Sequence, residues 1–177
     1  MPMALVRVIT DPRDHRAQLA SLGEAPRDPQ AAAERRDRTV ADLRLTRERL
    51  EHALSGVTGF ASLRNDQWSI VHVLGHLAGG SGGHFQPVYD IVLHGVTELQ
   101  PFVTRDQRLQ DATEVAFGEL DGCIEFALRL TPQQLMLHAS MDGRETSVIQ
   151  FIECAAQHFR QHVDQIESLC PQPTVDQ

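Results

Sequence analysis

Helix-capping signals divide this sequence into four long segments and constrain its fold more than any other feature. Asp28-Pro29 supplies a side-chain acceptor followed by a proline suited to the first turn of a helix. Ser69 predicts the start of a second helix, and the capping boxes Thr104-x-x-Gln107 and Ser147-x-x-Gln150 predict two more. We expect these helices to end near Ser55, Leu93, Leu130 and Leu169.

Four helices of this length joined by mostly short links predict an all-α fold, a four-helix bundle formed by residues 28–170. Residues 1–27 form a short N-terminal extension, in which Val6–Ile9 favours a strand and Asp14–Leu22 a short helix. Residues 171–177 are expected to be a disordered tail. Between the last two helices, Thr131-Pro132 predicts an extra helical turn, and residues 135–146, with the turn dipeptide Asp142-Gly143, favour a small hairpin.

Composition excludes several classes of function. The 177 residues contain no lysine, so Schiff-base chemistry and a lysine-dependent phosphate loop are excluded. The net charge of −8, with acidic and basic residues mixed along the chain, argues against nucleic-acid binding. The sequence predicts a cytoplasmic protein for three reasons. Its three cysteines are widely spaced and form no disulfide framework, it has no apolar run long enough to cross a membrane, and it shows no signal-peptide pattern.

Histidines at helical i,i+4 spacing are the strongest candidates for chemistry. On the fourth helix, His162 lies about 35° and His158 about 75° from the centre of the apolar stripe, so both face the buried side. Two imidazoles on successive turns of an inward face can bind one metal ion. The alternative is two histidines that flank the core and bond to carbonyl or carboxylate groups.

The second helix leaves the third ligand open. His76 lies about 115° from its apolar stripe and His72 lies farther, so His72 is expected to face solvent. Periodicity alone would select His84, which is nearer the centre of the stripe. However, Gly79–Gly83 and Pro87 predict a kink near residues 83–86 that would reset the helical phase.

Two sequence motifs resemble those of a known family. Trp68-Ser69-Ile70-Val71-His72-Val73-Leu74-Gly75-His76-Leu77 is similar to the opening of the second helix in the DinB-like (DinB/YfiT) family. Asp142-Gly143 followed by the segment from His158 to Ile166 is similar to the family's D-G … H-x-x-x-H-x-x-Q-I close. The resemblance covers roughly residues 29–170 and does not include the N-terminal extension.

The resemblance implies an up-down-down-up bundle whose metal ligands are His76, His158 and His162. Three neutral nitrogens leave a coordination position open for water or substrate, which is typical of a catalytic site. Zinc or nickel suits this ligand set best, and manganese or iron can also bind imidazole. Glu119 and Glu125 are candidate partners for the outer nitrogens of the ligands.

The resemblance also implies a reaction, a metal-dependent thiol S-transferase with a low-molecular-weight thiol as co-substrate. Two alternatives stay open: a metal-dependent hydrolase or isomerase, and a non-catalytic stress-response or binding module. Cys154 precedes His158 by four residues and could extend the ligand set, but it lies about 115° from the stripe centre and is better explained as a passive buried cysteine. We expect a small-molecule substrate and a homodimer formed through an apolar helix face.

Overall fold

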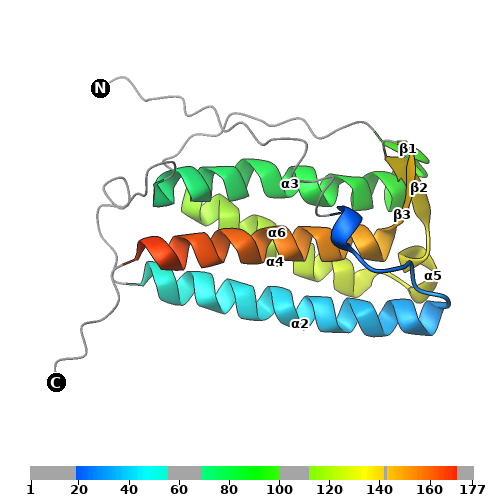
Figure 1. Cartoon of the computed structure of the whole chain (residues 1–177), viewed down its shortest axis with the longest axis horizontal. Coiled ribbons are helices and arrows are strands. Elements are labelled where there is room, and N and C mark those ends of the chain that lie inside the picture. The colour runs from blue at the N-terminus through cyan, green and yellow to red at the C-terminus, as the bar shows by residue number, and fades with distance from the viewer. Residues whose placement is uncertain (1–18, 56–68, 100–111, 142, 171–177) are drawn as a thin grey trace.

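The computed structural model describes residues 19–55, 69–99, 112–141 and 143–170, with the side chains of 78–84 outside the description. The described chain is mostly helical and carries a small three-stranded sheet at one end (Figure 1). Its long helices are α2 (Pro29–Leu54), α3 (Ile70–His94), α4 (Ala112–Arg129) and α6 (Val148–Leu169). A single turn, α5 (Pro132–Leu135), follows α4. The long helices lie in the four predicted segments, so their expected positions are confirmed.

Helices α2, α3, α5 and α6 begin at the residues that the capping signals predict. The Asp28 carboxylate accepts a hydrogen bond from the amide of Ala31 at 2.8 Å, ahead of Pro29 in the first turn of α2. Capping boxes occupy the N-termini of α3 at Ser69, of α5 at Thr131 and of α6 at Ser147. The Ser69 and Thr131 hydroxyls accept from amides three residues later, and at the start of α6 the Gln150 side chain accepts from the Ser147 amide. These bonds satisfy amides that have no partner within the helix, which is why each helix starts there.

The four long helices lie alongside one another (Figure 1). Helix α6 packs against α2 and α3, and α4 packs against the same two helices from the other side. The colour order in Figure 1 shows that α2 and α6 run in one direction and that α3 and α4 run in the opposite one. Apolar side chains from all four helices fill the interior, among them Leu43, Leu74, Leu120, Phe151 and Phe159.

Ion pairs join the polar helix α2 to its neighbours. Arg35 binds the carboxylate of Glu153 on α6 through Nε and Nη2, and both side chains are about four-fifths buried, with exposures of 18% and 19%. Arg49 reaches both Asp164 and Glu167 on α6. Further pairs join Asp42 to Arg160 on α6 and Arg47 to Asp121 on α4. Helix α2 is therefore attached by charge as well as by its apolar stripe.

The predicted hairpin is present and forms part of a larger sheet. Strands β2 (His138–Met141) and β3 (Arg144–Ser147) pair antiparallel, and Gly143 takes a positive φ of 77° in the connection. A two-residue strand, β1 (Glu98–Leu99), adds to β2 in parallel and was not predicted. Strand β3 continues directly into α6, since Ser147 is both its last residue and the N-cap of the helix.

Several sequence-based expectations lie outside the described residues. These are the strand at Val6–Ile9, most of the helix at Asp14–Leu22, the capping box at Thr104 and the tail 171–177. The backbone of α3 stays helical through Gly79–Gly83 and Pro87. Across the described ranges, no helix has both the length and the apolar content needed to cross a bilayer.

Candidate metal site

Helix α6 carries two of the candidate ligands on its inner side. Its apolar stripe buries Phe159 and Val163, and the histidines lie on the flank of that stripe. His158 is 3% exposed and His162 is half-buried. Sequence periodicity correctly predicted that both face inward. It predicted their relative burial wrongly: His162 was expected nearer the centre of the buried face, but His158 is the more buried of the two.

Helix α3 contributes the third histidine, His76, whose side chain is only 2% exposed. Its position about 115° from the apolar stripe had made it a weak candidate on periodicity. The stripe calculation assumes one packing partner, whereas α3 packs against both α4 and α6 and therefore buries a wider arc. The side chain of His84, the alternative on periodicity, lies outside the described residues.

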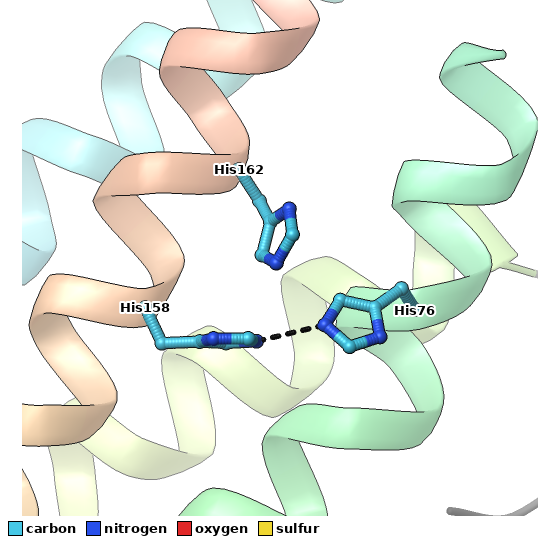
Figure 2. Close-up of side chains that lie close together, drawn as sticks. All are labelled: His76, His158 and His162. Carbon is cyan, nitrogen blue, oxygen red and sulfur yellow. Dashed lines mark hydrogen bonds between the residues drawn. The ribbon is translucent and has the colours of Figure 1, made fainter. Parts of the chain in front are cut away.

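The three rings converge on one point between α3 and α6 (Figure 2). The Nε2 atoms of His76 and His158 lie 3.0 Å apart. The His162 ring lies above this pair, with ring centroids 4.5 Å from each of the other two. One potential ligand atom from each residue falls within 4.8 Å of the others. Within the described residues, this is a group of histidine, cysteine or carboxylate side chains that could hold a metal ion.

The donor set fits a divalent transition metal. Metal–nitrogen bonds of about 2.1 Å place two ligand nitrogens about 3.0 Å apart at a right angle and about 3.4 Å apart in a tetrahedral site. The hydrogen-bonded His76 and His158 nitrogens, 3.0 Å apart, lie at the short end of this range, and the ligand atoms of all three residues lie within 4.8 Å of one another. Neutral imidazoles bind zinc, nickel, manganese and iron, so the donors fit a metal without selecting one.

A glutamine holds the outer nitrogen of one ligand. Nδ1 of His162 lies 3.1 Å from Oε1 of Gln165, one helical turn along α6. An amide oxygen only accepts hydrogen bonds, so the ring donates from Nδ1. Sequence reasoning gave Gln165 no role, although it is the Q of the H-x-x-x-H-x-x-Q-I motif and its i,i+3 spacing from His162 was a usable signal.

Two expectations for residues around the site were wrong. His72 is half-buried instead of solvent-facing, because it is the third residue of α3 and its Nδ1 lies 2.5 Å from the Ser69 hydroxyl in the capping box. Glu125 is exposed and bonds to Arg129 in the next turn, so it does not support a buried ligand. Cys154 is buried at 3% exposure and is not a member of the histidine group, consistent with a passive role.

A second set of titratable side chains lies where α3 packs against α4. Glu119 is half-buried, and burial raises its pKa. Burial and then the Glu119 charge raise the pKa of the fully buried Cys123 thiol. Tyr89, whose pKa burial also raises, packs in a cluster of rings with Phe85 and Phe126. At neutral pH both the thiol and the phenol are protonated.

Comparison with known proteins found no match: no family model, no curated protein and no solved structure corresponds to this chain. The structure alone shows a mostly helical protein with a mostly buried cluster of three histidines that could hold a metal ion.

Proposed function

We propose that this chain is a metal-dependent enzyme of the DinB-like kind, with a divalent ion bound by His76, His158 and His162. The observation that carries the proposal is the convergence of three imidazoles, two of them almost fully buried, from helices that are distant in sequence. In this structure a hydrogen bond joins the Nε2 atoms of His76 and His158, and a bound metal ion would replace it. A purely structural core would gain more from apolar side chains at these positions.

The proposed architecture is an up-down-down-up four-helix bundle. The opposite directions of the pairs α2/α6 and α3/α4 support it, as does the packing of each helix against its own pair partner and one member of the other pair. The sequence motifs around His76 and His158–His162 support the family in the same order along the chain. The N-terminal extension and the small sheet are additions to this plan.

The proposed reaction is transfer of a low-molecular-weight thiol to an electrophile. His76, His158 and His162 would hold a divalent ion, whose positive charge would lower the pKa of the thiol. The thiol sulfur then forms a bond to the electrophilic carbon, the leaving group departs with its electron pair, and the thiol proton goes to solvent. The chain's own part is to hold the three ligands and to limit water around them, as the burial of His76 and His158 supports.

The first test is metal content. Untagged protein purified from cells should contain close to one divalent ion per chain, and His158→Ala should lose it. His52→Ala, which changes an exposed histidine of α2, is the matched control and should keep the metal. No metal in the wild type, even after incubation with zinc, nickel and manganese, would refute the metalloenzyme proposal.

The second test is thiol consumption. Metal-loaded protein should accelerate the loss of glutathione, bacillithiol or mycothiol in the presence of an alkylating electrophile, and the His158→Ala variant should not. A loaded protein that consumes none of these thiols would refute thiol transfer while leaving the metal site intact. Hydrolysis of an ester by the same preparation without thiol would then favour a hydrolase.

A further inference from the structure

The bond between His162 and Gln165 determines which nitrogen of His162 faces the cluster. Because Nδ1 carries the hydrogen donated to Gln165, the lone pair of the neutral ring lies on Nε2. In Figure 2 the ring is turned so that its Nε2 side faces His76 and His158 while Nδ1 points away from them. The hydrogen bond and the ring orientation therefore select the same nitrogen as the metal ligand.

Gln165 is itself held in place by the surrounding helices. It lies on α6 between Asp164 and Glu167, and both of these carboxylates bind Arg49 of α2 at 2.6 and 2.5 Å. The hydrogen bonds that Arg49 donates to Glu167 and Asp164 raise its pKa, so the guanidinium stays charged. This turn of α6 is thus fixed to α2, and the Gln165 amide is presented to His162 from a braced backbone.

His162 needs such support more than the other two histidines. His76 and His158 are almost fully buried and their rings are confined by packing, whereas His162 is half-buried. A half-exposed imidazole can rotate about its side-chain bonds and exchange between its two neutral forms. One directional hydrogen bond at the outer nitrogen restricts the rotation of the ring and favours one of the two neutral forms.

We propose that Gln165 is a positioning residue of the metal site, which orients His162 and fixes its Nε2 as the ligand atom. The inference rests on the proposed binding of a metal by the three histidines. Hydrogen bonds to the outer nitrogen of a ligand histidine typically contribute about 10- to 100-fold in metal affinity. The amide performs this function without adding negative charge, so the bound ion keeps its full Lewis acidity.

The test is a substitution series at Gln165, with zinc affinity measured by competition against a chromophoric chelator. Gln165→Met keeps the length of the side chain but removes the acceptor, and it should weaken zinc binding by about 10- to 100-fold. Gln165→Glu restores an acceptor and should bind zinc at least as tightly as the wild type. Gln30→Met is the matched control, because Gln30 is a helical glutamine that donates to Glu34 in the next turn of α2, and it should leave affinity unchanged.

A second readout does not need the metal. In metal-free protein labelled with ¹⁵N-histidine at pH 8, the His162 signals, identified by their loss in His162→Ala, should show hydrogen on Nδ1. Gln165→Met should shift these signals toward a mixture of the two neutral forms.

The outcomes separate this inference from the proposed function. Wild-type protein that binds zinc together with a Gln165→Met variant of the same affinity would overturn the inference alone. Wild-type protein that binds no zinc would overturn the proposed function, and the ¹⁵N spectra would then decide whether Gln165 orients the ring. Spectra identical in wild type and Gln165→Met would overturn the inference in that case as well.

Discussion

The ion pair between Arg35 and Glu153 should contribute measurably to the stability of the fold, in contrast to most ion pairs on its surface. Two opposite charges about 4 Å apart attract by about 4 kcal/mol at the effective dielectric near a protein surface. Partial desolvation and the ordering of two long side chains offset part of this, which leaves a coupling of about 2 kcal/mol. Exposures of 18% and 19% limit screening by solvent, and the contact uses two guanidinium nitrogens.

A double-mutant cycle in urea measures this coupling. Arg35→Met should destabilise the protein by about 2–3 kcal/mol, because it leaves a mostly buried carboxylate unpaired. Glu153→Gln should have a smaller effect, and the double variant should be more stable than the sum of the two changes predicts. The additional bond from Arg35 to the Glu24 carbonyl cancels in the cycle.

The chain supplies its own control pair. Arg129 and Glu125 form an ion pair within α4 through Nη2 of the arginine, and their side chains are 75% and 68% exposed. The equivalent cycle there should give no more than about 0.5 kcal/mol, and about 1 M salt should abolish it. If the coupling at Arg35–Glu153 is no larger than at the control pair, the burial argument is refuted.

Three further predictions concern the metal, the half-buried acid and the thiols. Adding zinc at about 100 times its dissociation constant should stabilise the protein by about 2.7 kcal/mol, and a chelator should reverse the rise in melting temperature; no shift with zinc would contradict specific binding to the folded state. The pKa of Glu119 is raised by burial, so the folded state binds its proton more tightly and loses stability as pH rises above the ordinary glutamate range. Glu119→Gln should therefore be more stable than the wild type at neutral pH but not in acid, and equal pH profiles in urea unfolding would exclude this. Burial raises the pKa of the Cys154 thiol to about 12 and holds that of Cys123 well above its ordinary range, so iodoacetamide should modify Cys170 first, as intact mass measured over time would show. Labelling of all three thiols at one rate would mean that the core opens readily.

The helices were predictable from sequence because their starts depend on local chemistry. Asp28 and Ser69 accept from amides three residues later, and Gln150 accepts from the Ser147 amide, so a short stretch of sequence contains the whole interaction. The two-residue strand β1 could not be predicted, because it exists only through its parallel pairing with β2 about forty residues later.

The site was predictable in part for the same reason. The inward direction of His158 and His162 follows from the single apolar stripe of α6. The burial of His76 depends on how many helices surround α3, which a one-stripe projection does not contain. For His76 the resemblance to a family supplied the residue, and periodicity did not. His72 was misjudged because its position in the first turn, not its angle, determines its contacts.

The separation of 82 residues between His76 and His158 gives the cluster a consequence for folding. His158 and His162 are brought together by one turn of α6, so a nascent helix can present both of them before the rest of the chain is folded. The third nitrogen arrives only when α3 docks, and holding a loop of this length closed in an unstructured chain costs about 4–5 kcal/mol. A metal ion would therefore bind His158 and His162 before α3 docks, and it would bind His76 as well only after docking. An ion bound by all three rings would act as a reversible cross-link between the two halves of the chain. The cysteines of the described residues form no disulfide.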